Sequence, residues 1–343
     1  MSDGQGAIST RERVLARIRH DSRFALATHE HPDGDALGSL VAMQELLSAL
    51  GKDSVMYVSP DDLPLPSEYE MFLLEDAIHS PPADIAERTV VFLDCGNIDR
   101  NSAGVLRDGA HLLNIDHHHD NTRFGTVNHV VADASCTAEI VWDLMHGLRV
   151  RPTLVAAQAL YVGLITDTGR FMYENTGPKA HLMAAELIEA GVDVADVYRQ
   201  LYEEMPPEKL ALMTLALGHL QRFDDGELTL ASLSAEDFER TEAEEYYAEG
   251  VVDQLRALRG TKVAVLVRAV MSGERRGQRK VSLRATGDDV DVSLIARAQG
   301  GGGHRRAAGF STPLDLDELI AFLRPAVAAQ LHASDGHAAA TLA

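Results

Sequence analysis

The chain has 343 residues, and its 31 Lys and Arg against 52 Asp and Glu give a formal net charge of −21. This charge excludes a protein that coats long nucleic acids or anionic membranes by bulk electrostatics. Two cysteines cannot form a disulfide framework, no apolar run reaches the roughly 20 residues of a membrane span, and residues 1–10 lack an apolar secretory core, so we expect a cytoplasmic protein without a membrane partner.

The first half of the chain alternates short apolar segments with segments of helical periodicity. Buried strands are predicted at 23–28, 54–58, 89–93 and 111–115, and helices at 36–50, 135–146, 153–165 and 178–190. Apolar strands that alternate with helices indicate an α/β fold with a mainly parallel, doubly wound sheet. We place this first domain at residues 1–195.

The second half predicts a smaller α/β domain at residues 223–331, after a helical connector at 196–222 that is broken by two prolines. Strands are predicted at 228–233, 261–270 and 279–285, and helices at 290–298 and 316–330. A polar turn between the last two strands favours a hairpin. Residues 332–343 are small and polar, and we predict a disordered tail there.

Histidine and aspartate gather where the predicted strands of the first domain end. The strand at 23–28 runs into His29-Glu30-His31-Pro32-Asp33-Gly34-Asp35, the strand at 89–93 into Asp94, and the strand at 111–115 into Asp116-His117-His118-His119. Asp167 closes a further apolar segment. Because open α/β sheets bind ligands at the carboxyl ends of their strands, these groups should meet at one edge.

So many carboxylates at one place repel one another unless positive charge lies among them. Carboxylates suit Mg²⁺ and Mn²⁺, and imidazole shifts the preference toward Mn²⁺ and later transition metals. The groups are too many for one ion and fit two, an arrangement that commonly hydrolyses phosphate esters. Each motif alone has a structural alternative, since Asp33 and Asp35 could cap a helix and the three histidines could form a polar loop. The joint pattern favours the metal site.

These motifs together resemble a known family. The order His29, Asp33, Asp35, then Asp94, then Asp116-His117-His118, then Asp167 resembles the four motifs of the DHH phosphoesterase superfamily. Gly301-Gly302-Gly303-His304 resembles the signature of the DHH-associated C-terminal domain. The resemblance covers roughly residues 13–310 and is greatest to the group of bifunctional oligoribonucleases and pAp phosphatases.

The resemblance implies a bound pair of divalent ions, with Mn²⁺ expected and Mg²⁺ or Co²⁺ as alternatives. It assigns His29, Asp33 and Asp94 to the first ion, and Asp35, Asp94, His117 and Asp167 to the second, with Asp94 bridging them as a catalytic residue. It places His118 at the scissile phosphate, as a catalytic residue that contacts substrate or assists proton transfer. Arg170 is a candidate phosphate contact from its position after Asp167, with a surface salt bridge as the alternative.

The resemblance further implies that the second domain grips the nucleotide. Glycines let the main chain approach a ligand closely, although a flexible helix stop is the alternative reading of a glycine run. Arginine offers bidentate contacts to phosphate. The residues implied in this grip are Ser282, Arg284, Gly302, Gly303 and His304, and the charge of the neighbouring Arg305 makes it a further candidate.

The expected function is a metal-dependent phosphoesterase. The resemblance implies its substrates: a hydroxide activated by two metals would hydrolyse very short RNA to nucleoside 5′-monophosphates, and 3′-phosphoadenosine 5′-phosphate (pAp) to AMP. The alternatives are a phosphodiesterase for linear or cyclic dinucleotides, a catalytically silent nucleotide-binding regulator, and an adventitious metal binder.

The distribution of charge bears on the expected partners. Residues 256–310 carry 12 basic and 4 acidic side chains, which favours small nucleotides held at one basic wall and still excludes long nucleic acids. Dimerisation is common in the family, so the resemblance also implies a homodimer.

Overall fold

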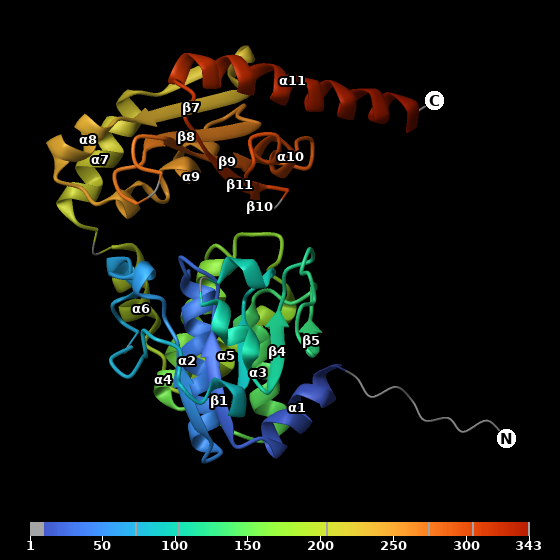
Figure 1. Ribbon diagram of the computed structural model, residues 1–343. Helices are drawn as coiled ribbons and strands as arrows, with labels where there is room; N and C mark the ends of the chain where they lie inside the picture. The colour runs from blue at the N-terminus through green and yellow to red at the C-terminus, as the bar shows by residue number, and fades with distance from the viewer. Residues whose placement is uncertain are drawn as a thin grey trace. The chain divides into compact units, whose positions relative to one another are not determined.

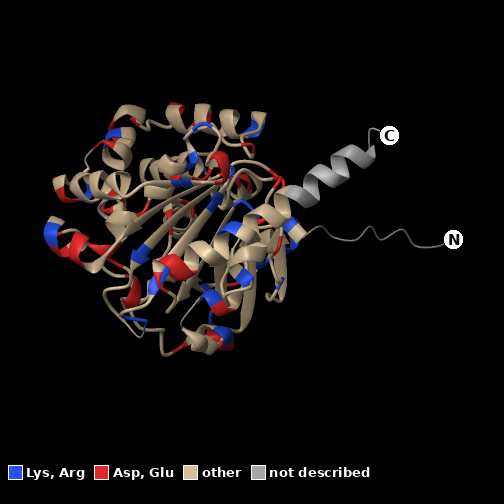
Figure 2. Ribbon diagram, turned by 90° about the horizontal axis from the view of Figure 1, so that it is seen from above, with Lys and Arg blue, Asp and Glu red and all other residues tan. Residues whose placement is uncertain are grey.

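The computed structural model describes residues 10–341 except Leu73, Ser102, Glu204, Glu274 and His304. The chain divides into two compact units, Met1–Glu204 and Met205–Ala343 (Figure 1). The segment predicted as a connector contributes α6 (Val194–Tyr202) to the first unit and α7 (Pro207–Gly218) to the second. Asp and Glu, red in Figure 2, are spread over the ribbon rather than confined to one segment.

The first unit is built on a parallel sheet. Its strands are β1 (Arg23–Ala27), β2 (Asp53–Met56), β3 (Thr89–Leu93), β4 (His111–Asp116) and β5 (Val127–Val130), in the order β2-β1-β3-β4-β5. All neighbouring strands run parallel, as predicted. Strand β5 was not predicted, because its sequence VNHV is a short edge segment that buries only alternate residues.

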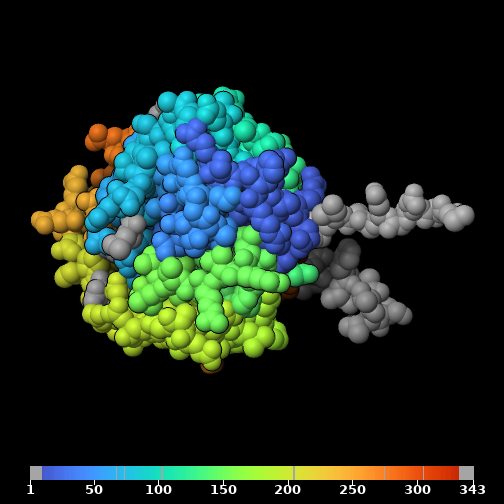
Figure 3. All heavy atoms as spheres, turned by 90° about the horizontal axis from the view of Figure 1, so that it is seen from below, coloured from blue at the N-terminus to red at the C-terminus, as the bar shows by residue number. Residues whose placement is uncertain are grey.

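Six helices of this unit share one large apolar core with one face of the sheet, among them α6, which contributes Val197 and Leu201. The other five are α1 (Thr10–His20), α2 (Gly34–Ala49), α3 (Thr137–Leu148), α4 (Leu154–Asp167) and α5 (Pro178–Glu189). Seen from below in Figure 3, the blue N-terminal segment lies beside the green helices. The other face carries a smaller core around Phe92, covered by 3₁₀ turns such as Ile85–Glu87 and Gly104–Asp108. The segment that crosses it from β2 is rich in proline, which disfavours a long α-helix.

Helices α2 and α4 cross at glycines. A Cβ at Gly38 would lie 2.3 Å from the carbonyl oxygen of Ala159, so only glycine permits this approach. One turn further along α4, a Cβ at Gly163 would lie 2.9 Å from a carboxylate oxygen of Asp35. The close crossing therefore holds the first turn of α2, with its acidic residue, against the middle of α4.

The second unit has a six-stranded sheet in the order β10-β11-β9-β8-β7-β6. Its strands are β6 (Gln221–Phe223), β7 (Leu228–Leu233), β8 (Val263–Ala269), β9 (Arg279–Ala285), β10 (Gly302–Gly303) and β11 (Ala307–Thr312). The predicted hairpin is confirmed as the antiparallel pair β8–β9, whereas β7 and β8 run parallel.

Helices cover both faces of this second sheet. Alternate residues of β8 point into two separate cores, one on each face of the sheet. Val265 and Val267 face α10 (Val292–Arg297) and α11 (Leu316–Thr341). Leu266 faces α7, α8 (Ala235–Thr241) and α9 (Val251–Arg256). Helix α11 extends past residue 330, where the prediction ended it, into the segment 332–343 that was predicted to be disordered. The alanines of this segment favour helix. No helix among the described residues is long and apolar enough to cross a bilayer.

We predict that Gly38→Ala lowers the free energy of unfolding by about 1–3 kcal/mol, because the added methyl group overpacks the α2–α4 contact. The measurement is the urea midpoint. Gly218→Ala is the matched control, since a Cβ there meets no atom within 4 Å and alanine favours the helix. A Gly38→Ala midpoint equal to or above that of wild type would contradict the packing argument.

Candidate metal centre and active site

The carboxyl ends of β1, β3 and β4 bring the predicted residues to one edge of the sheet. The Nε2 atoms of His29 and His117 lie 3.6 and 3.7 Å from the two carboxylate oxygens of Asp94. Asp94 has a φ of 55°, a left-handed conformation that is uncommon outside glycine. Three neighbouring strands thus aim imidazole and carboxylate groups at a common point around Asp94.

Two helices complete this cluster. Asp35 lies in the first turn of α2, and Asp167 is the last residue of α4, with its Oδ2 3.7 Å from Nε2 of His117. Ligand atoms lie within 4.8 Å of one another in three groups that could hold a metal ion: His29, Asp33 and Asp94; Asp35, His117 and Asp167; and Asp94, His117 and His118. The structure therefore brings together all six predicted metal ligands.

The donor set of this cluster fits divalent cations. Burial raises the pKa of the Asp35 carboxyl well above its ordinary value, and the charges of Asp94 and Asp167 raise it further. Burial likewise raises the pKa of Asp167 to about 7. Burial opposes ionisation of Asp94 as well, yet the hydrogen bond from His29 and the charges of the nearby imidazoles hold the pKa of Asp94 well below its ordinary value. A bound cation would remove this conflict among buried carboxylates.

The N-terminus of α3 holds Asp35 in place. The backbone N–H groups of Thr137 and Ala138 donate to its two oxygens at 2.6 and 2.9 Å. The Thr137 hydroxyl donates to Asp94 at 3.0 Å. Sequence reasoning missed Thr137, because it begins an ordinary amphipathic helix and belongs to no motif. It connects the carboxylate of Asp35 with that of Asp94, the proposed bridging ligand.

Hydrogen bonds to the histidine rings determine which nitrogens face the cluster. Nδ1 of His29 bonds the carbonyl of Glu30 at 2.7 Å, which directs Nε2 toward Asp94. Nδ1 of His118 lies 2.7 Å from the carboxylate of Asp116, a fully buried side chain that accepts a further bond from Asn121. Burial lowers the pKa of His118, but the bond to Asp116 and the charge of Asp94 outweigh it and raise the pKa to about 9.

The other residues of the motifs lie at the margin of the cluster. Asp33 is exposed and also caps α2, because its side chain accepts from the N–H groups of residues 35 and 36. Both readings of Asp33, ligand and cap, are thus compatible with the structure. The side chain of His31 is 74% exposed, and its backbone N–H donates to Asp62. His119 is also exposed.

Arg170 lies in a turn that begins after Asp167 and ends at Asn175, whose side chain contacts Asp167 again. Gly169, Arg170 and Phe171 all have positive φ, and Asn175 returns to donate to the Asp167 carboxylate at 3.2 Å. The Arg170 guanidinium stacks over the ring of Tyr202, 5.0 Å from its centroid. Among the residues that the structure describes, its contact is with this aromatic ring, and no ion pair joins it to any of them.

In the second unit, the structure places four of the predicted nucleotide-binding residues on β9 and β10, the two strands that flank β11. Ser282 and Arg284 alternate with buried residues of β9, and Ser282 pairs with Gly309, which pairs in turn with Gly302. Gly303 has a φ of 132°, and a Cβ there would lie 2.5 Å from a carbonyl oxygen, so the close pairing of β10 requires glycine. Arg305 donates to the carbonyl of Asp288. His304 lies outside the described residues.

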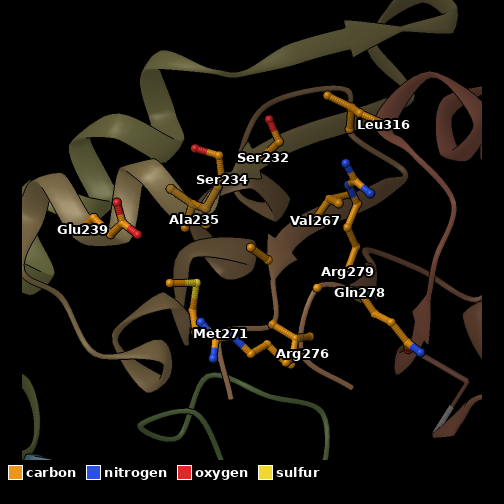
Figure 4. Close-up of a pocket in the computed structure, with 14 residues that line it drawn as sticks. Ser232, Ser234, Ala235, Glu239, Val267, Met271, Arg276, Gln278, Arg279 and Leu316 are labelled. Atoms are coloured by element: carbon orange, nitrogen blue, oxygen red, sulfur yellow. The ribbon is translucent and has the colours of Figure 1, made fainter. Parts of the chain in front are cut away.

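A separate pocket of about 420 Å³ opens beside the β8–β9 hairpin (Figure 4). Its lining combines apolar side chains such as Val267, Met271 and Leu316 with Arg276 and Arg279. None of the predicted nucleotide-binding residues that the structure describes lines this pocket.

Comparisons with known proteins agree with this architecture. Residues 23–164 match the DHH family N-terminal domain, and residues 238–329 match the DHHA1 domain. The chain is 33% identical to the bifunctional oligoribonuclease and PAP phosphatase NrnA of Thermus thermophilus over 309 residues, 89% of each chain. It is 27% identical to the protein of the same name from Bacillus subtilis, over 83% of this chain and 88% of that one.

A solved structure supports the fold over nearly the whole chain. An exopolyphosphatase-related protein from Bacteroides fragilis superposes with a TM-score of 0.84 at 22% identity, covering 95% of this chain and 97% of that one. With both domain types in order and relatives of this identity and coverage, the chain belongs to the DHH phosphoesterase superfamily, in the group that carries a C-terminal DHHA1 domain.

Proposed function

We propose that this chain is a divalent-metal-dependent phosphoesterase that hydrolyses very short RNA to nucleoside 5′-monophosphates and pAp to AMP. The observation that carries the proposal is the pair of ligand groups around His29 and His117, each with its donor atoms within 4.8 Å. The substrate class is supported by the names of the relatives at 33% and 27% identity. Mn²⁺ is the proposed metal, with Mg²⁺ or Co²⁺ as alternatives.

The proposed ligands follow the geometry of the cluster. His29, Asp33 and Asp94 hold one ion, Asp35, His117 and Asp167 hold the other, and Asp94 is shared because His29 and His117 face its two different oxygens. When bound, two such ions neutralise phosphoryl oxygens and lower the pKa of water. Thr137 and the start of α3 keep Asp94 and Asp35 in place for this task.

His118 supplies a donor to the substrate in this proposal. The N–H at Nδ1 of His118 donates a hydrogen bond to Asp116, so a proton on Nε2 points away from Asp116. The N–H at Nε2 can then donate a hydrogen bond to a phosphate oxygen. Such a preorganised donor stabilises negative charge that develops in the transition state. Asn121 supports it by holding the second oxygen of Asp116.

We propose that the second unit binds the nucleotide part of the substrate. The residues proposed to bind it in that unit are Ser282, Arg284, Gly302, Gly303, His304 and Arg305. For the first unit, taken by itself, Arg170 is the proposed phosphate contact. A homodimer is part of the same proposal and rests on the family resemblance. The proposed location in the cytoplasm rests on the two cysteines and on the absence of an apolar secretory core in residues 1–10.

A substrate panel tests the proposed function. With Mn²⁺ present, the purified chain should release mononucleotides from 5′-phosphorylated di- and trinucleotides and phosphate from pAp, as resolved by chromatography. It should act poorly on a single strand of about 20 nucleotides, because the acidic chain repels long polyanions. Cleavage of cyclic dinucleotides alone would favour the alternative substrate class. No product from any of these compounds, with folded and metal-loaded protein, would contradict the proposal.

We predict that His118→Ala lowers kcat about 10²–10⁴-fold, because it removes the donor that Asp116 orients. Metal content, measured by mass spectrometry of the dialysed protein, should stay as in wild type, since His118 is not a proposed ligand. His119→Ala, a change to the exposed neighbour, is the matched control and should keep kcat within about twofold of wild type. Equal kcat values for the two variants would refute the role of His118.

We predict that metal-free protein loses stability as the pH rises from about 4 to about 7, because the raised pKa values of Asp35 and Asp167 make the folded state bind more protons than the unfolded state in this window. The measurement is the Tm in a chelator across this range. Mn²⁺ should reverse the loss.

The matched variants separate this effect from the general charge of the chain. Asp35→Asn should raise the metal-free Tm at pH 7 and flatten its pH dependence, because the amide carries no charge to desolvate. Asp120→Asn, an exposed change nearby, should leave the pH dependence as in wild type. A metal-free Tm of Asp35→Asn below that of wild type at pH 7 would speak against carboxylate repulsion as the cause.

A further inference from the structure

Lys280 extends the row of proposed nucleotide-binding residues on β9. Lys280, Ser282 and Arg284 alternate along the strand with Val281 and Leu283, which are buried in the core under α11. The three polar side chains therefore project from the opposite face of the sheet. Arg279, one residue before Lys280, belongs to the other alternation and lines the pocket of Figure 4.

The surroundings of Lys280 are strongly basic. In the sheet, Lys280 lies opposite Arg268 of the neighbouring strand β8 and opposite Ser311 of the neighbouring strand β11. The guanidinium of Arg275 reaches over to donate to the Ser311 hydroxyl at 3.3 Å. Burial lowers the pKa of Lys280, and the charge of Arg268 lowers it further. The side chain thus lies between two other cations on a half-buried surface.

Acidic neighbours compensate this charge only in part. Glu245 forms an ion pair with Arg268 at 2.7 Å, and Glu245 and Glu249 both attract Lys280 from a longer range. No hydrogen bond or ion pair joins the Lys280 ammonium to a residue that the structure describes. A half-buried ammonium beside like charges is costly unless an anion satisfies it.

We propose that Lys280, flanked by Arg268 and Arg275, is a phosphate subsite that binds a terminal phosphate of a nucleotide substrate. The proposal rests on the proposed function and deepens it, because it states which oligonucleotides are favoured. Two residues of a strand span about 6.6–6.8 Å, so Lys280 lies one such step from Ser282 and two from Arg284. This spacing is comparable to that of successive phosphates in an extended nucleotide. Substrates with a 5′-phosphate should therefore bind more tightly than those without it.

The test compares the 5′-phosphorylated dinucleotide pApA with ApA, which lacks that phosphate, in steady-state hydrolysis by the full chain with Mn²⁺. Lys280→Met should raise KM for pApA about tenfold and leave kcat and the KM for ApA as in wild type. Lys280→Arg should restore most of the loss. Lys262→Met is the matched control, because it removes a partly exposed ammonium from the residue that precedes β8, one that pairs with Asp289.

The outcomes separate the subsite from the proposed function. Equal KM values for pApA in wild type and Lys280→Met, with turnover intact, would overturn the subsite alone. Absence of turnover in wild type would overturn the proposed function. In that case the subsite is tested by binding alone, measured as the rise in Tm that pApA causes. A smaller rise in Lys280→Met than in wild type supports the subsite, and an equal rise overturns it. Because Lys280→Met removes an unsatisfied cation, its Tm without ligand should equal or exceed that of wild type.

Discussion

Repulsion among the carboxylates of the buried Asp35 and Asp94 and the half-buried Asp167 is the constraint on which the rest of the first unit depends. These groups lie together where burial and mutual charge oppose their ionisation. The chain stabilises them partly, through the N–H groups at the start of α3 and through the imidazoles around Asp94. A pair of divalent ions would neutralise the remaining negative charge. This charge destabilises the metal-free folded state, and the same charge favours the binding of metal.

The fold explains how the carboxylates and imidazoles stay close together despite their repulsion. Parallel strands deliver His29, Asp94 and His117 to one edge because their carboxyl ends meet there. The glycine crossing of α2 and α4 adds Asp35 and Asp167 from the helical layer. A rigid sheet and two closely packed helices thus fix the donor atoms, and the second unit separately presents a basic strand with glycines that allow close backbone approach.

Much of this could be predicted from the sequence, because the relevant signals are local. Strand β3 is the predicted segment 89–93, and the His and Asp motifs follow directly from strand ends. Other features depend on contacts between distant segments. Thr137 carries no motif, and its role follows only from the packing of α3 against α2. The basic surroundings of Lys280 likewise arise from the register of β8, β9 and β11, which alternation alone does not determine.

The central claim is that the acidic and imidazole cluster holds two divalent ions on either side of Asp94. Crystals of the Mn²⁺-loaded protein, measured at the manganese absorption edge, test it most directly. The account predicts two anomalous peaks about 3.5–4 Å apart, one contacting His29 and Asp33 and the other contacting Asp35, His117 and Asp167, with Asp94 contacting both. A single peak, or two peaks without Asp94 between them, would contradict the account.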